Sequence, residues 1–401
     1  MTSVIKSSKV SLKFCNTGKK EALGAFLVEY RKLVGYFVDE LWGIPKIPSL
    51  LPKDITEKAD TWLSARMRQC AAKQASGIVR GCLKKQSQRL YVIDKLKGEG
   101  KFKKARRLQR VYDEVSVSKP TLDEVEPQLD ARFVKVDWTR SEEFDGWLTV
   151  SSIGEGMKLV LPLKKTRHFN KLMEAGVLRS GVRLSSAAAC FCFDLTVPDV
   201  PELGATVGID VGLIDTLSCS TGQVIGKCPH GHTYQTICQR LARKRKGSKG
   251  FLRTTRHRTN FLHWAVNQVD LSGVSIMQRE NIKHLRKFKR NRRVMQAWNY
   301  KELFDILDGK AAYAGVQIRL LNPSYTSQRC SECGWTWKGN RKGKAFRCAK
   351  CGFAHDADLN ASLNLSFNLV ELPPKIHLKH PSRAGFYWVV SGQEPIVPAV
   401  L

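Results

Sequence analysis

Residues 207–212 read VGIDVG, an apolar strand pattern that a single acid interrupts. Apolar residues occupy every second position, and this period of two predicts a strand near the start of an α/β unit. An unpaired buried carboxylate is costly, so Asp210 is expected to have a partner or a function. The flanking Gly208 and Gly212 remove side-chain bulk and would let a substrate backbone approach. By itself the motif also fits an aspartate in a turn.

Two further acids stand along the same α/β unit. Residues 275–281 (SIMQREN) predict a strand that ends at Glu280, and residues 355–362 (HDADLNAS) predict a loop running into a helix. Asp358 would lie in the first turn of that helix, where the helix dipole favours negative charge. Taken singly, Glu280 fits a surface charge and Asp358 fits an N-cap. Asp356, two residues earlier, could share or take the role of Asp358.

The three acids together are more specific than any one of them. Two strand acids and one helix-start acid in one α/β domain can converge at one end of a sheet. Carboxylates are the hard ligands that Mg²⁺ or Mn²⁺ prefers, and two such ions about 4 Å apart can drive phosphodiester hydrolysis. Asp210, Glu280 and Asp358 are therefore the predicted catalytic and Mg²⁺-binding residues.

Two cysteine pairs form the strongest local motif. Cys330 and Cys333, then Cys348 and Cys351, give a CxxC…CxxC pattern around a short basic and aromatic segment. Four thiolates at this spacing suit one closed, structural Zn²⁺ site. Two disulfides are the alternative, which a reducing compartment disfavours. A weaker metal candidate, with no common zinc spacing, is the cluster of Cys228, His230, His232 and Cys238.

The charge of the chain indicates a polyanionic partner. Its 401 residues include 67 Lys and Arg against 36 Asp and Glu, for a formal charge of +31. Nucleic acid is favoured over a membrane surface or an acidic protein. No apolar run approaches the roughly 20 residues of a membrane span, and residues 1–20 have no signal-peptide core. We therefore expect a protein of the reducing cytoplasm.

Nucleic-acid contacts are expected at basic and aromatic positions spread along the chain. They are Lys103, Lys104, Arg106, Arg107, Arg243, Lys244, Arg245, Lys246, Arg329 and Trp335. Other side chains of the cysteine-rich segment could contact nucleic acid or form its ordinary surface: Trp337, Lys338, Arg341, Lys342 and Lys344.

The pattern along the chain predicts a multidomain α+β protein. Residues 9–15 alternate like a strand, residues 23–41 repeat apolar positions at helical spacing, and residues 132–197 contain short strands (132–138, 146–152, 157–163 and 189–197). We interpret these as an N-terminal β-barrel with an inserted helical domain. The expected segments are 1–16 (first barrel strand), 17–128 (helical recognition domain), 129–200 (barrel, wedge-like), 201–321 (nuclease, first part), 322–354 (zinc ribbon), 355–370 (nuclease, second part) and 371–401 (weakly ordered tail).

Several motifs, in this order, resemble TnpB proteins and the miniature type V CRISPR effectors. They are GIDVG with Asp210, the basic stretch 240–250, NFLHWAV (260–266), the strand ending in Glu280, NPSYTSQRCSECG (322–334), the second cysteine pair and DADLNAS (356–362). The resemblance covers about residues 205–368. The family usually has Ala-Ala-x-Asn-Ile after the final acid, where this chain has Ala-Ser-Leu-Asn-Leu at 361–365.

This resemblance implies a RuvC-type, RNase H-like α/β nuclease domain with an inserted zinc ribbon. It assigns the metal-binding acids to Asp210, Glu280 and Asp358, with two Mg²⁺ (or Mn²⁺) ions, and one structural Zn²⁺ to the four cysteines. It implies a prokaryotic, RNA-guided endonuclease that cleaves double-stranded DNA chosen by guide RNA pairing and a short flanking motif. A guided repressor without cleavage and an unguided RuvC-like nuclease are alternatives. A transposon protein or a CRISPR effector, and one or two copies per RNA, both stay open.

Overall fold

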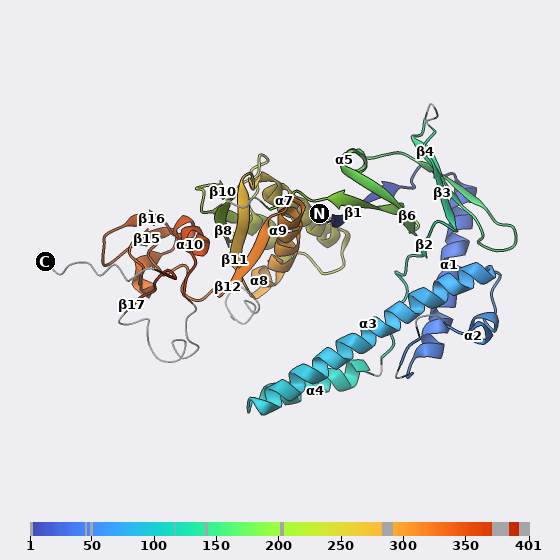
Figure 1. Cartoon of the computed structure of the whole chain (residues 1–401), viewed down its shortest axis with the longest axis horizontal. Helices are drawn as coiled ribbons and strands as arrows, with labels where there is room; N and C mark the ends of the chain where they lie inside the picture. Colours follow the sequence, from blue (N-terminus) through green and yellow to red (C-terminus); the bar gives the residue numbers. More distant parts are fainter. Residues whose placement is uncertain are drawn as a thin grey trace. The chain divides into compact units, whose positions relative to one another are not determined.

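The computed structural model describes residues 3–44, 46–48, 51–116, 118–139, 141, 143–200, 204–282, 292–370 and 385–392. Contacts divide the chain into two compact units: Ile5–Thr196, and Val197–Leu401 together with Met1–Val4. Figure 1 shows the elements of each unit along the chain. Within the described ranges, no helix is long and apolar enough to cross a membrane.

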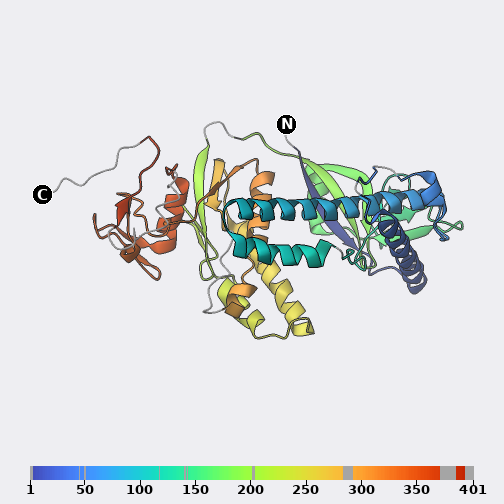
Figure 2. The ribbon, with the colours of Figure 1, turned by 90° about the horizontal axis from the view of Figure 1, so that it is seen from below.

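The first unit contains a set of helices that follows its first strand. They are α1 (Thr17–Leu41), α2 (Lys53–Glu57), α3 (Ala65–Gly98) and α4 (Phe102–Ser116). The side chain of Asn16 caps α1 by accepting from the Lys19 N–H at 2.9 Å. The apolar positions of α1 predicted from the sequence are all buried, which confirms that amphipathic helix. α3 packs against α1 and α4, and α3 and α4 lie side by side in Figures 1 and 2.

The strands of the first unit form two antiparallel sheets. One has the order β1-β7-β6-β2 and the other β3-β4-β5. Their bounds are β1 (Ser3–Ser11), β2 (Gln128–Leu129), β3 (Val134–Asp137), β4 (Gly146–Val150), β5 (Leu159–Leu163), β6 (Gly176–Leu184) and β7 (Ala188–Thr196), with α5 (Arg167–Ala175) before β6. Because β1 pairs with β7, the helices α1 to α4 lie in the chain between two strands of one sheet.

Two details of these strands differ from the sequence-based expectation. β1 begins at Ser3 rather than near Lys9, because its exposed edge carries polar residues that hide the alternation. β6 was not predicted, since its sequence GVLRSGVRL has glycines at its start and in its interior, within a mixed pattern, and a register shift between Leu178 and Val182. The barrel itself stays a prediction.

The second unit is built on a mixed five-stranded sheet of order β10-β9-β8-β11-β12. Its strands are β8 (Ala205–Val211), β9 (Leu217–Cys219), β10 (Val224–Ile225), β11 (Val274–Glu280) and β12 (Gln317–Leu321). β8, β11 and β12 run parallel, while β9 pairs antiparallel with both β8 and β10. The helices are α6 (Tyr234–Ala242), α7 (Lys249–Gln268), α8 (Arg292–Ala297), α9 (Tyr300–Tyr313) and α10 (Ala357–Ser366).

The alternation along β8 divides the two faces of this sheet. Val207, Ile209 and Val211 belong to the buried core that α6, α7 and α9 share. Gly208 and Asp210 point to the opposite face, where α10 packs against β8. Figure 1 shows α10 on one side of the strands and α7 and α9 on the other. This face therefore presents an acid beside the start of a helix.

Small strands between β12 and α10 form a separate layer around the cysteine pairs. They are β13 (Trp335–Thr336), β14 (Arg341–Lys342), β15 (Ala345–Arg347) and β16 (Ala354–Asp356), and β14-β15-β16 make one sheet. β17 (Phe386–Tyr387) pairs with β13, and Trp388 is 5% exposed. The prediction of a weakly ordered tail is thus wrong for residues 385–392. The rest of that segment, 371–384 and 393–401, lies outside the described residues.

Candidate active site and zinc site

Two of the predicted catalytic acids come from neighbouring parallel strands. β8 and β11 pair in a register that matches Gly208 with Gln278 and Ile209 with Arg279. Continuing this register sets Asp210 beside Glu280, at the carboxyl ends of both strands. Parallel strands place their carboxyl ends at the same edge of a sheet, so two residues 70 positions apart in sequence meet there.

The third acid arrives on α10, whose approach depends on a glycine. A Cβ added at Gly208 would lie 2.1 Å from the Ser362 carbonyl oxygen, so only glycine fits beneath the helix backbone. An added Cβ at Gly212 would lie 3.9 Å from Asp358 Oδ2. The interpretation that Gly208 admits a substrate backbone is therefore wrong: it admits α10. Asp358 is 6% exposed in the first turn of that helix.

Asp356 has a different role from Asp358. Its carboxylate caps α10 by accepting from the backbone N–H groups of Asp358, at 2.9 Å, and of Leu359, at 3.0 Å. The cap fixes the first turn and thereby the direction of the Asp358 side chain. The possibility that Asp356 takes the ligand role is not supported, because one of its oxygens is committed to the helix end.

A pocket of about 760 Å³ is lined by Asp210, Glu280 and Asp358 together. Burial, reinforced by the charges of Glu280 and Asp358, raises the pKa of Asp210 well above its ordinary value. Burial also raises the pKa of Glu280, although a hydrogen bond from Thr326 opposes the rise. Such a group of acids calls for positive counter-charge, and the donor set suits hard divalent cations.

Two cations of the cysteine-rich segment already contact these acids. Arg341 Nη2 lies 2.7 Å from Asp358 Oδ1, and Lys344 Nζ bridges Asp358 Oδ2 and Asp215 Oδ2. The sequence left Arg341 and Lys344 open as nucleic-acid contacts or plain surface. Instead both line the pocket. Only the fold could reveal this, because nothing in a basic hairpin sequence distinguishes an inward from an outward cation.

The four cysteines fit a tetrahedral zinc ion. Cys330 Sγ lies 3.6 Å from Cys351 Sγ, Cys333 Sγ lies 3.6 Å from Cys348 Sγ, and all four sulfurs lie within 4.8 Å of one another. Zn–S bonds of about 2.3 Å imply sulfurs about 3.8 Å apart. Gly334 and Gly352 follow the two pairs with φ of +76° and +77°, the left-handed conformation that closes each turn.

Within the ranges that the structure describes, these cysteines are the one group of three or more His, Cys, Asp or Glu side chains whose ligand atoms lie close enough together to hold one metal ion. Cys228, His230, His232 and Cys238 do not form such a group. Asp210, Glu280 and Asp358 do not form such a group either. A pair of ions about 4 Å apart needs a wider ligand set than one ion does.

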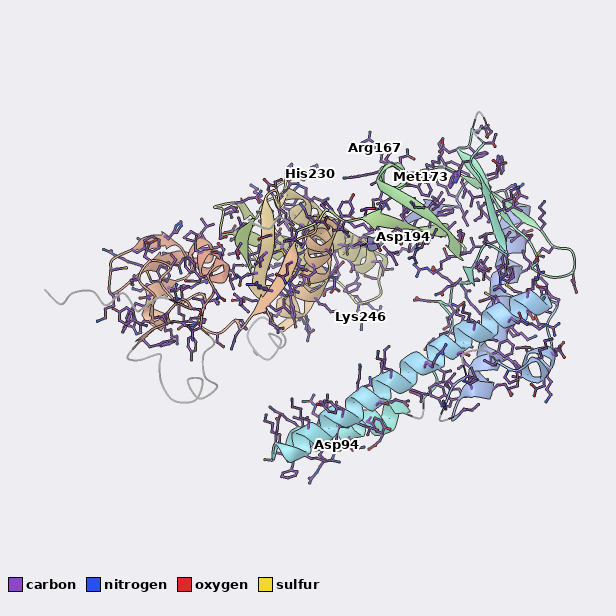
Figure 3. All side chains as sticks on the ribbon, in the orientation of Figure 1. Asp94, Arg167, Met173, Asp194, His230 and Lys246 are labelled. Carbon is purple, nitrogen blue, oxygen red and sulfur yellow. The ribbon has the colours of Figure 1, made fainter. Side chains whose placement is uncertain are left out.

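The expected nucleic-acid contacts divide into exposed and buried residues. The α4 set (Lys103, Lys104, Arg106 and Arg107) is exposed, and so is the turn between α6 and α7 with Arg243, Lys244, Arg245 and Lys246. Figure 3 labels Lys246 in that turn. Trp335 is half-buried against Tyr387, with ring centroids 5.0 Å apart. All of these stay predictions.

Arg329 corrects the list. It is 3% exposed. Its Nε donates to the Trp388 carbonyl at 2.8 Å, and its Nη1 donates to Asn364 Oδ1 at 2.6 Å. Burial lowers the pKa of Arg329 to about 10. The prediction that Arg329 contacts nucleic acid is wrong, because its donors are used inside the protein.

The sequence also missed Thr326 and two asparagines of α10. Thr326 Oγ1 donates to Glu280 Oε1 at 2.5 Å and is 1% exposed. Asn360 and Asn364 are fully buried. Two asparagines one turn apart, each flanked by leucine or alanine in this helix, were the available signal, because buried amides require partners.

Comparison with known proteins follows the same part of the chain. Residues 300–365 match the family model of the TNB domain of Cas12f1-like proteins. The CRISPR-associated endodeoxyribonuclease Cas12f1 of Sulfoacidibacillus thermotolerans is 34% identical over 146 residues, which is 36% of this chain and 34% of that protein. A TnpB-like protein of Methanocaldococcus jannaschii is 32% identical over 80 residues, 20% of this chain and 28% of that protein.

This chain thus spans less than half the length of the curated relatives that it matches. A solved structure, that of the mini RNA-guided endonuclease CRISPR-Cas_phi3, is similar over 90% of this chain and 92% of its own, with a TM-score of 0.57 and 10% identity. That likeness shows a shared fold. The resemblance stated from the motifs is confirmed: the matched part of the chain is similar to TnpB-like proteins and to the miniature type V CRISPR-associated nuclease Cas12f1.

Proposed function

We propose that the protein is an RNA-guided endonuclease that cleaves double-stranded DNA in one RuvC-like, RNase H-like site. The observation that carries this proposal is the single pocket lined by Asp210, Glu280 and Asp358, which come from β8, β11 and α10. The names of its relatives support it: Cas12f1 is an endodeoxyribonuclease, and a Streptomyces pristinaespiralis relative, 26% identical over 189 residues, is named an RNA-guided DNA endonuclease of presumed activity.

The chemistry needs no nucleophilic side chain. Two Mg²⁺ or Mn²⁺ ions, when bound, would supply an activated water and charge stabilisation for phosphodiester hydrolysis. Hydrolysis would join a water oxygen to phosphorus as one ester P–O bond breaks, and the leaving oxygen would take up a proton. Asp210 and Glu280 would hold the ions from the strand side, and Asp358 from the helix side.

The remaining residues of the pocket arrange charge around the acids. Arg341 and Lys344 contact Asp358 from the ribbon hairpin. When ions take over Asp358, the same two cations would face the pocket and attract the backbone phosphates of DNA. The four cysteines would hold one structural Zn²⁺ and have no part in bond breaking.

Guidance by a bound RNA is supported by the charge of the chain and by its similarity to RNA-guided nucleases. A formal charge of +31 needs neutralisation, and a bound RNA would provide it. In guided nucleases of this kind, RNA pairing reads the target while the protein reads a short flanking motif and the heteroduplex backbone. The exposed basic residues of α4 and of the α6–α7 turn are the proposed backbone contacts.

The first experiment is to purify the protein from cells that carry its native locus and to sequence the bound RNA. A discrete RNA species is expected. The reconstituted complex should then cut a plasmid bearing the matching target in Mg²⁺, and Asp210→Asn should reduce cutting by at least about 1,000-fold. Asp270→Asn is the matched control, since Asp270 is an exposed acid in the loop between α7 and β11. Normal cutting by Asp210→Asn would sink the assignment.

A second function, guided DNA binding without cleavage, is favoured by one observation. Both carboxylate oxygens of Asp358 are engaged by Arg341 and Lys344. If these ion pairs persist in the loaded complex, the third metal ligand is lost. Tight, guide-dependent target binding with no cleaved product at any Mg²⁺ or Mn²⁺ concentration would establish this alternative.

A further inference from the structure

We propose that residues 326–331 connect the zinc ribbon to the catalytic acids, with Thr326 as the residue that positions Glu280. The inference rests on the proposed function only in that the acids bind divalent ions. Thr326 Oγ1 donates to Glu280 Oε1 at 2.5 Å and lies 3.3 Å from the Pro323 carbonyl oxygen. A hydroxyl has one proton, and the shorter bond to a charged carboxylate takes it.

The backbone of Thr326 is itself fixed from α10. Asn364 Nδ2 donates to the Thr326 carbonyl at 3.0 Å and to the Arg329 carbonyl at 2.7 Å. Thr326 is 1% exposed and Asn364 is fully buried. Buried amides of this kind hold their partners in one geometry, because breaking the bonds leaves polar groups unpaired.

The other end of the connector is the first zinc ligand pair. Asn360 Nδ2 donates to the Arg329 carbonyl at 2.8 Å, and Asn360 Oδ1 accepts from the Ser331 N–H at 3.0 Å. Cys330 therefore lies between two residues that one asparagine holds. Cys330 is also fully buried, so the chain around it has no freedom to move independently of α10.

The short helix α10 thus links the cysteine-rich segment, Thr326 and the acid Asp358. Asn360 and Asn364 lie four residues apart on one face of α10, and Asp358 stands in the first turn of the same helix. A displacement of the cysteine knuckle would shift Thr326 and α10 together. Glu280 would lose its hydrogen bond and Asp358 its position, so an intact zinc ribbon is a condition for an intact pair of metal ligands.

The test measures Mn²⁺ binding to the full-length, zinc-loaded protein without nucleic acid, by calorimetry or electron paramagnetic resonance. Thr326→Val keeps the shape of the side chain and removes the hydroxyl. It should lower Mn²⁺ affinity on the order of tenfold, as loss of a ligand's hydrogen-bond partner commonly does. Thr326→Ser restores the donor and should stay near the wild-type affinity. Thr255→Val, which removes a hydroxyl bonded within α7, is the matched control.

Zinc content and thermal melting are recorded for every variant. A folded, zinc-loaded Thr326→Val with wild-type Mn²⁺ affinity would overturn the positioning role of Thr326. Cys351→Ser, which changes the exposed ligand, should lose zinc and Mn²⁺ affinity together. Zinc loss with unchanged Mn²⁺ affinity would overturn the coupling.

Asp210→Asn separates this inference from the proposed function. If wild-type protein shows no Mn²⁺ binding that Asp210→Asn removes, the catalytic metal site fails and the inference falls with it. If Asp210→Asn removes binding but Thr326→Val leaves it intact, the inference alone fails.

Discussion

The proposed zinc site and the carboxylate pocket, which are the two proposed metal sites, are assembled in different ways. The four sulfurs come from two tight turns and lie within 4.8 Å of one another. The three acids come from two strands and a helix, and one of them is paired with Arg341 and Lys344. Local turns preform the first site, whereas the second depends on long-range packing and on exchanging ion pairs for ions. The zinc site should therefore be sensitive mainly to the loss of a ligand, and the carboxylate pocket should respond to packing, charge and pH.

The largest expected effect comes from removing a zinc ligand. Cys330→Ser should abolish stoichiometric zinc, because a structural zinc contributes about 10 kcal/mol or more to the fold of its site. Metal analysis and limited proteolysis within 322–354 would report the loss. Cys82→Ser, at a half-buried cysteine of α3, is the control. One full zinc per chain in Cys330→Ser would contradict the four-sulfur site.

A packing change beneath α10 should break the pocket. Gly208→Ala places a Cβ 2.1 Å from the α10 backbone, so stability should fall by about 3 kcal/mol or more, with loss of Mn²⁺ binding. Chemical denaturation and calorimetry measure both. Gly77→Ala meets no atom within 4 Å in the middle of α3 and should gain about 0.5 to 1 kcal/mol. Equal behaviour of the two variants would refute the packing role of Gly208.

Removing a positive charge beside the acids should have a smaller effect, on Mn²⁺ affinity alone. Lys344→Met removes a cation that bridges Asp358 and Asp215. Since a divalent ion no longer has to displace this ammonium, Mn²⁺ affinity should rise by about 3- to 10-fold. Lys342→Met changes an exposed lysine of the same hairpin and should have little effect. A fall in affinity for Lys344→Met would mean that the lysine orients Asp358 rather than competing for it.

The smallest expected effect is on thermal stability as a function of pH. The pKa values of Asp210 and Glu280 are raised in the folded protein. Above the ordinary carboxyl values the folded state then holds more protons than the unfolded state, so the free energy of unfolding falls as pH rises through this window.

Divalent ions replace those protons. Mg²⁺ should therefore raise the Tm more at about pH 8 than at about pH 5.5, as calorimetric melting can measure. Asp210→Asn should shrink the difference. An equal Mg²⁺ effect at both pH values would show that the acids are already ionised without metal.

The sequence predicted what depends on local pattern. The VGIDVG alternation predicted β8, and the strand before Glu280 and the helix after Asp356 appear within a residue of their expected positions. The cysteine spacing predicted the cage. In each case the relevant contacts lie within one strand, one helix or one turn, where periodicity and spacing carry the information.

What the sequence did not predict depends on distant partners. Arginine is usually found at the protein surface, yet Arg329 is buried and its guanidinium donates to Asn364 and to the Trp388 carbonyl. Residues 386–387 have no strand pattern of their own, because β13 supplies their hydrogen-bond partners. We predicted that Gly208 lets a substrate backbone approach. Nothing in the sequence around Gly208 indicates that α10, about 150 residues later, packs against it.

The double duty of α10 limits how this protein could be rebuilt. Asp358, Asn360 and Asn364 lie in one helix of 10 residues. This helix packs against both the cysteine-rich segment and the five-stranded sheet. A chimaera that exchanges only the loop between the cysteine pairs preserves these contacts, whereas a graft of the whole ribbon must carry α10 with it. Engineers seeking interchangeable ribbons should place their junctions before Pro323 and after Ser366.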